Sequence, residues 1–308
     1  MARYEEISNY YRSENSEGMD VERFIHLQKE EVDDYLSFLI EPKVNFSKSN
    51  VFFENISPSF FELYIWKLFF KNTYDNQLLC DAIAFCTMEL FTEYGSQNSE
   101  IQYFDMDLYK QGAAILLLMA CNRVDIARYC YPFLIEGLKN SKLDDVKDLK
   151  SQRLIILAVE MLASEKKQTI DWGNFGIAVD RFYSDFVKNA LYSEDKEVLN
   201  EWLTALCDNH LKWSARTEST ENEFGTNGYE IEAQYLLLWP FELQAVKNFR
   251  ALHRLTTPEI DHPLCKTPMA IDHKPDYSKW NAPVWFAPLV DELIVLNPRI
   301  AFVKDFFK

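Results

Sequence analysis

The chain has 308 residues, of which 48% are hydrophobic and 15% aromatic, which is enough to bury a large core. Its formal net charge is -16, and the acidic excess lies in residues 1–239, which carry 40 acidic and 23 basic side chains. A surface of this sign repels nucleic acid and anionic membranes and attracts basic partners, unless the charge only keeps the protein soluble. We therefore expect neither a nucleic-acid nor a membrane partner.

The start of the chain and its apolar runs predict a cytoplasmic protein. Residues 1–11 lack the basic end and the apolar stretch of a secretory signal. The longest apolar run, residues 112–121, has ten residues, whereas spanning a bilayer takes about twenty. Six cysteines form no Cys-x-x-Cys pair, and most lie in apolar helical patterns. We expect them to be free, buried thiols.

Helical patterns recur from about residue 20 to residue 255. Apolar residues at three- and four-residue spacing predict a first helix from Asp20 to Glu41, which Pro42 ends. A second helix is predicted to begin at Ser57-Pro58, because proline suits the first helical position. Further helices are expected over about 76–94 (ending at Gly95), 105–121, 123–139 (with a kink or break at Pro132), 144–164, 173–192 and 193–213.

The composition changes after residue 214. Residues 214–228 are polar and predict an exposed loop, and a helix is expected from about Tyr229 to Leu255, interrupted or restarted at Trp239-Pro240. Eight of the eleven prolines lie at or beyond residue 240. We predict that residues 256–308 form an irregular segment wrapped over the helical body, with aromatic anchors at Tyr277, Trp280, Trp285 and Phe286.

These elements predict an all-α fold. Short connections between helices favour antiparallel neighbours. We expect a single helical domain over 1–308, with antiparallel helix pairs packed as a helical bundle or a short solenoid-like array over about 20–255 and a Pro-rich irregular C-terminal segment. Helix pairs recur roughly every 35–45 residues, but no residue signature repeats with them, so no motif supports a repeat array.

The sequence contains no recognisable catalytic motif. There is no Gly-x-Ser-x-Gly or His-Glu-x-x-His, and eight glycines in the whole chain disfavour phosphate-binding loops. We expect no enzyme activity, no cofactor and no metal. The rival hypothesis is a helical hydrolase that uses a cluster with metal-like chemistry, although its spacing matches no structural zinc pattern and local turn hydrogen bonds explain it as well: Asp261, His262, Cys265, Asp272 and His273.

His210 shares an apolar helix face with Leu206 and Trp213. This placement predicts a hydrogen-bonded core or interface histidine, with a general base as the alternative.

An acidic stretch over residues 193–232 is the remaining feature. It holds ten acidic residues against three basic ones, together with four aromatic residues. Carboxylates steer a basic partner and aromatic side chains supply buried contacts, although a solvated helix face followed by a loop would have the same composition. We predict a partner-binding surface that comprises Trp213, Glu218, Glu221, Glu223, Phe224, Tyr229 and Glu230.

The segment Gly228-Tyr229-Glu230-Ile231-Glu232-Ala233 resembles the Gly-Tyr segment of helical immunity proteins from bacterial polymorphic and type VI secretion toxin systems, including those paired with PoNe-type DNases. Glu230 stands where that group typically has an aromatic residue, and its downstream Pro-Tyr-Asp signature is absent. The resemblance implies a non-catalytic cytoplasmic protein that binds one cognate toxin and occludes its active site or substrate path. The alternative function is a helical-repeat scaffold that binds a peptide or a regulatory partner.

Overall fold

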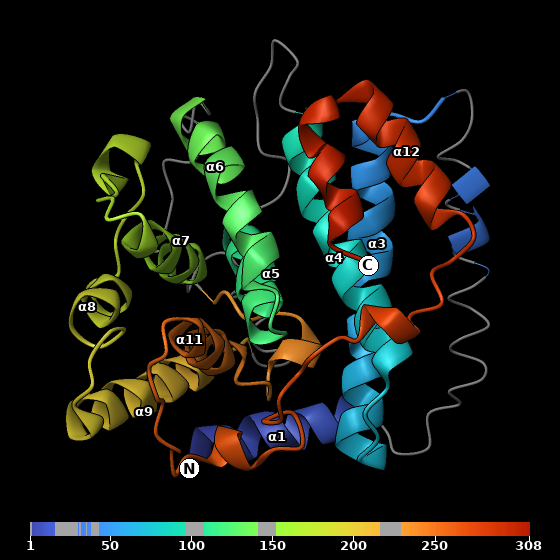
Figure 1. The fold of residues 1–308 in the computed structure, drawn as a ribbon. Helices are drawn as coiled ribbons and strands as arrows, with labels where there is room; N and C mark the ends of the chain where they lie inside the picture. The colour runs from blue at the N-terminus through green and yellow to red at the C-terminus, as the bar shows by residue number, and fades with distance from the viewer. Residues whose placement is uncertain are drawn as a thin grey trace. The chain divides into compact units, whose positions relative to one another are not determined.

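A computed structural model describes residues 2–15, 43–96, 108–140, 152–215 and 229–308, with a few helical positions between 30 and 37 (Figure 1). Over these residues the chain is helical, with one isolated backbone bridge and no extended strand, which confirms the all-α class. The α-helices are α1 (Ala2–Glu14), α3 (Phe46–Lys71), α4 (Asn76–Ser96), α5 (Leu108–Ala120), α6 (Val124–Asn140), α7 (Arg153–Glu165), α8 (Arg181–Asn189), α9 (Lys196–Trp213), α11 (Phe241–Leu252) and α12 (Phe286–Leu296).

Short 3-10 helices connect or extend these α-helices. They are η2 (Trp172–Phe175), η3 (Gln234–Leu236), η4 (Pro263–Lys266), η5 (Tyr277–Lys279) and η6 (Pro298–Asp305). Among the described residues, no helix combines the length and apolar character needed to cross a membrane. The helix expected over 20–41 lies largely outside the described residues, as do the expected starts of α5 and α7.

The chain divides into two compact units. Unit 1 consists of Met1–Glu14 and Tyr103–His273, and unit 2 of Asn15–Gln102 and Lys274–Lys308. The expectation of a single domain over 1–308 stays a prediction.

Unit 2 is built on the α3–α4 hairpin, whose helices pack along each other. The Asn45 side chain caps α3 by accepting a hydrogen bond from the Lys48 N–H, and Asn72 ends it in the left-handed conformation. The prediction that a helix begins at Ser57-Pro58 is wrong, because Pro58 lies inside α3. Burial of aromatic side chains on both sides of this proline outweighs the backbone hydrogen bond that it removes.

The C-terminal residues of unit 2 are more regular than the sequence suggested. The predicted irregular segment gives way to α12 and then η6, so its irregular part ends at Trp285. Trp285 stacks on Phe85 of α4 with ring centroids 5.5 Å apart, and Phe286 lies 6.0 Å from the same ring. The expected aromatic anchors therefore do pack, and they do so inside unit 2.

Unit 1 is centred on α5, which packs against both α7 and α11 (Figure 1). A Cβ atom added to Gly112 would lie 2.3 Å from the Ile155 backbone nitrogen. The α5 and α7 backbones therefore approach closely at a position that only glycine allows. α6 continues through Pro132, so the expected break is not there.

Two helical predictions in unit 1 are wrong. Residues 173–192 do not form one helix: η2 ends at Gly176, whose φ of 70° belongs to the left-handed region, and α8 starts only after the Asp180 cap. No helix begins at Tyr229 either, because residues 229–233 are extended or bent until η3 begins. The predicted helix after Trp239-Pro240 is present as α11.

Candidate functional site

α9 presents an apolar face to unit 1 and carboxylates to solvent. The Asp195 side chain caps its N-terminus by accepting hydrogen bonds from the N–H groups of Glu197 and Val198. Glu197, Glu201 and Asp208 are exposed. Trp213, predicted on the apolar face with Leu206 and His210, is only partly buried. The buried residues recur at helical spacing: Leu199, Leu203, Leu206, Cys207, His210 and Leu211.

A backbone bridge brings the end of α9 next to the segment that follows residue 228. The Ala215 N–H donates to the Ile231 carbonyl over 2.7 Å, and the Ile231 N–H donates to the Trp213 carbonyl over 3.2 Å. The Glu230 N–H donates to the same Trp213 carbonyl. The backbone of residues 213–215 is therefore held against that of residues 230–231.

Arg153, the first residue of α7, holds this corner together. Its guanidinium carbon lies 3.2 Å from the centroid of the Trp213 ring, a cation–π arrangement. The same guanidinium donates to Glu230 over 3.1 Å and to Asp180 over 3.0 Å. Arg153 is buried and fully engaged by these partners, so it acts as an internal brace for the Trp213 ring.

Glu230 completes the brace from the opposite side. Its carboxylate accepts hydrogen bonds from the backbone N–H groups of Arg153 and Leu154, both 2.9 Å long. Gln152, the residue at the cap position of α7, makes no side-chain capping bond. Glu230 therefore supplies the missing cap from another part of the chain, where a carboxylate also suits the helix dipole.

Burial governs the acidity of Glu230, whose side chain is only 4% exposed. Burial raises the pKa of Glu230 to about 7, although the Arg153 charge and the two backbone donors oppose this shift. A carboxylate so enclosed holds its segment in place and presents no surface to a partner.

Arg3 of α1 binds the same C-terminal end of α9. Its guanidinium donates to the carbonyls of Leu211 and Ser214, at 3.2 and 2.6 Å. These are among the carbonyls that the end of a helix leaves without intrahelical partners. α1 therefore fixes the end of α9 from outside the helix.

The structure brings together three of the seven residues that the sequence assigned to a partner surface. Trp213 and Tyr229 are partly exposed, and Glu230 is buried. The other four lie outside the described residues: Glu218, Glu221, Glu223 and Phe224. Sequence reasoning missed Arg153, Asp180 and Arg3, and the one available signal for Arg153 was a charged residue at the start of a strongly apolar helix.

His210 is the hydrogen-bonded core histidine that the sequence predicted. Its Nδ1 lies 2.7 Å from the Glu242 carboxylate and its Nε2 lies 3.1 Å from the Leu237 carbonyl. Burial lowers the pKa of His210, but the charge and hydrogen bond of Glu242 outweigh that effect, so the pKa is raised. Both ring nitrogens are used inside unit 1, which leaves no lone pair for general-base chemistry.

The residues of the rival metal cluster have separate internal partners. Asp261 pairs with Lys266, and Asp272 accepts a hydrogen bond from Asn122. His273 is fully buried and bonds to the Met269 carbonyl. Over the described residues, no three His, Cys, Asp or Glu side chains converge as metal ligands.

Comparisons with known proteins add no relative: no family model, no curated protein and no solved structure matches the chain.

Proposed function

We propose that this chain is an immunity protein that binds a cognate toxin in the cytoplasm, through the face formed by the end of α9 and residues 229–232, and blocks the toxin by occlusion. The partner is a protein, and the chain supplies neither catalysis nor a cofactor. The identity of the partner as a toxin rests on the resemblance carried by the Gly228–Ala233 segment.

The observation that carries the proposal is the braced, partly exposed Trp213 ring, next to the segment that contains the partly exposed Tyr229. Trp213 is held against the Arg153 guanidinium, and Tyr229 precedes the buried Glu230 anchor. Aromatic side chains on a rigid frame lose little conformational entropy when they bind, which is why such residues supply much of the binding energy of protein interfaces.

The charge on the exposed side of α9 supports a basic partner. Glu197, Glu201 and Asp208 are exposed along α9, with Lys196 and Lys212 as the basic residues of that helix. Residues 216–228, which connect Ala215 to Tyr229 in the sequence, contain three more glutamates. Carboxylates in this arrangement raise the association rate of a basic protein.

The role of Glu230 differs from that of its neighbours in this proposal. Because its carboxylate caps α7 and pairs with Arg153, Glu230 positions Tyr229 and leaves partner contact to the residues around it. The contact residues of the proposal are Trp213, Tyr229 and the acidic residues of α9 and of segment 216–228.

A growth assay tests the function. Expression of the polypeptide encoded immediately upstream of this chain's gene should arrest growth of a bacterial host, and co-expression of the chain should restore it. An upstream product that is harmless, or that remains toxic in the presence of the folded chain, would contradict the proposal.

Matched variants test the face. Y229A should weaken binding of the purified upstream product at least tenfold, a loss of about 1.4 kcal/mol or more. E197K/E201K should slow association, and high salt should reduce the difference from wild type. The controls are Y129A and E136K, which change exposed residues of α6 and should bind as wild type does. Equal losses in the control and test variants would remove this face from the proposal.

A further inference from the structure

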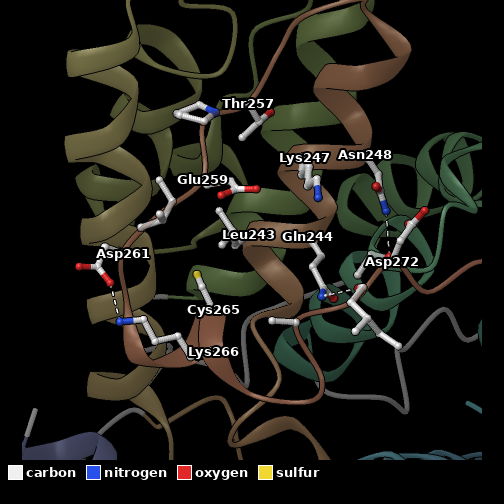
Figure 2. A pocket seen from close by; sticks show the side chains of 15 residues that line it. Leu243, Gln244, Lys247, Asn248, Thr257, Glu259, Asp261, Cys265, Lys266 and Asp272 are labelled. Carbon is white, nitrogen blue, oxygen red and sulfur yellow. Dashed lines mark hydrogen bonds and ion pairs between the residues drawn. The ribbon is translucent and has the colours of Figure 1, made fainter. Parts of the chain in front are cut away.

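A pocket of about 640 Å³ lies in unit 1, and none of its lining residues belongs to the face proposed for the partner. One wall is α11, and the wall across from it is the loop of residues 257–266, which ends in η4 (Figure 2). The last residue of α5 and residues 270–272 complete the lining. Pockets of about 300 to 1,000 Å³ are typical of sites that bind small molecules.

Side chains of α11 hold the surrounding segments in place. Gln244 donates to two carbonyls of residues 269–271, both over 2.9 Å. Asn248 donates to the carbonyls of the last two residues of α5, at 2.9 and 2.8 Å. Arg250 donates to the Thr257 hydroxyl over 3.2 Å. The walls are therefore fixed by bonds within unit 1, and a ligand would enter a preformed site at little cost in ordering.

Apolar side chains supply part of the lining. They come from every wall of the pocket: Ala120, Leu243, Pro258, Ile260, Ala270 and Ile271. Ile260 is itself buried. A ligand with an apolar body would therefore remove apolar surface from water on both sides of the contact.

Five charged side chains also line the pocket, and three of them have partners within the protein. Lys266 pairs with Asp261 over 2.6 Å, and Asp272 accepts a hydrogen bond from a neighbouring amide over 2.6 Å. The remaining two are Lys247 of α11 and Glu259 of the loop. Within the described part of the chain, neither of these two side chains forms an ion pair.

The two unpaired charges have opposite signs and stand on opposite sides of the pocket. Figure 2 shows the Lys247 nitrogen on the α11 side and the Glu259 carboxylate on the loop side. Both side chains are exposed, so they are open to a ligand. A molecule with a carboxylate at one end and an ammonium at the other would pair with both of them.

The whole set of charges favours a ligand that carries both signs. A simple anion would meet three carboxylates in the same pocket, and a simple cation would leave Lys247 without a partner. Because like charges repel and unlike charges attract across an interface, one charge of each sign fits this lining better than either sign alone.

We propose that this pocket binds a short zwitterionic peptide, with its carboxylate at Lys247, its ammonium at Glu259 and its apolar side chains against Leu243 and Ile260. The inference does not depend on the proposed function, because the pocket uses α11 and residues 257–272 and requires no protein partner.

Calorimetric titration of the full folded chain with leucyl-leucine tests the proposal. The dissociation constant should be about 1 mM or tighter. N-acetyl-leucyl-leucine lacks the ammonium and leucyl-leucine amide lacks the carboxylate, so each should bind about fivefold more weakly, the effect of one exposed ion pair. Leucine, which carries both charges on one carbon atom, should also bind more weakly than the dipeptide.

Variants assign each charge of the ligand to a side chain. K247A should bind leucyl-leucine and its amide equally well, and E259A should bind leucyl-leucine and its N-acetyl form equally well. Each comparison is made within one variant, so a general loss of stability does not imitate it. K188A and E136A, which change an exposed lysine and an exposed glutamate outside the pocket, should discriminate between the ligands as wild type does.

The wild-type chain alone is enough to overturn the proposal. Wild type that does not bind leucyl-leucine, or that binds leucine or both blocked analogues as tightly as the dipeptide, would contradict a site for a zwitterionic peptide. K247A that still prefers the dipeptide to its amide, or E259A that still prefers it to the N-acetyl form, would overturn the assigned orientation and with it the proposal.

Discussion

Among the described residues, unit 1 buries more charged side chains than unit 2, in which Asp81 and Glu93 are buried. Unit 2 packs aromatic rings against one another, and Phe85 alone contacts Phe53, Phe60, Trp285 and Phe286. The core of unit 1 also contains a set of buried charged residues that bond to one another or to backbone carbonyls: Arg153, His210, Glu230, Glu242 and Arg250.

We infer from this difference that the buried aromatic rings contribute mainly to stability, whereas the buried charges mainly position other side chains. Aromatic rings stabilise the fold mainly through the apolar area that they remove from water, and their packing tolerates a range of ring orientations. A buried ion pair is weak evidence for stability, because desolvation offsets its attraction, but it has strict geometry. In unit 1 the Arg153 guanidinium pairs with Glu230 and packs on the Trp213 ring, so these charges are best explained by the position in which they hold that ring.

The largest expected effect is in the aromatic core of unit 2. F85A should lower the free energy of unfolding by about 4 kcal/mol, because it removes a fully buried ring and leaves a cavity. F85L, which keeps much of the apolar volume, should lose less than about 1.5 kcal/mol. Denaturant titration checks both values, and equal losses in the two variants would show that ring packing is not what holds this core.

The next effect tests the brace in unit 1. R153M should destabilise the chain by about 3 kcal/mol, because it leaves the Glu230 carboxylate buried without its charge partner. R128M removes the exposed partner of Glu165 and should cost no more than about 1 kcal/mol. If the Arg153 pair acts as a unit, R153M/E230Q should lose less than the sum of R153M and E230Q, and an additive cycle would contradict the brace.

The smallest expected effect on stability at neutral pH is that of His273, whose protonation affects the free energy of unfolding only at acidic pH. Burial lowers the pKa of His273 from 6.5 to about 4. The contribution of neutral His273 to the free energy of unfolding is therefore complete above pH 6.5. It is lost as the pH falls toward 4, because His273 takes up a proton at a higher pH in the unfolded chain than in the folded chain. The loss amounts to about 3 kcal/mol at pH 4.

H273Q should remove this part of the acid sensitivity. The difference in unfolding free energy between wild type and H273Q should change between about pH 6.5 and pH 4 and stay constant at higher pH. H253Q is the matched control, since it replaces a partly exposed histidine of the same unit. A wild-type minus H273Q difference that is flat over this range would show that His273 is not held neutral by the fold.

Local patterns predicted the α-helices where the apolar spacing and the cap agreed. The helix predicted over 193–213 is present as α9, which begins after the Asp195 cap. The two prolines inside α3 and α6 misled the prediction, because tertiary burial outweighs a lost backbone hydrogen bond. At Tyr229 the apolar pattern suggested a helix, but the backbone of the next two residues bonds to the Trp213 carbonyl instead.

The candidate site could be predicted only in outline. The acidic and aromatic composition of residues 193–232 drew attention to Trp213 and Tyr229. The Arg153–Glu230 contact joins residues 77 positions apart in the sequence, and no local sequence pattern predicts such a pair. The burial of Glu230 follows from that contact, so composition alone placed it on the surface with its acidic neighbours.

Hydrogen exchange of the full chain, with and without the purified product of the upstream gene, tests the central claim most directly. If the braced face binds that product, backbone protection should increase in residues 208–215 and 229–233, at the end of α9 and in the segment bonded to it. Protection confined to α6 or to the α3–α4 hairpin, with these residues unchanged, would contradict the account.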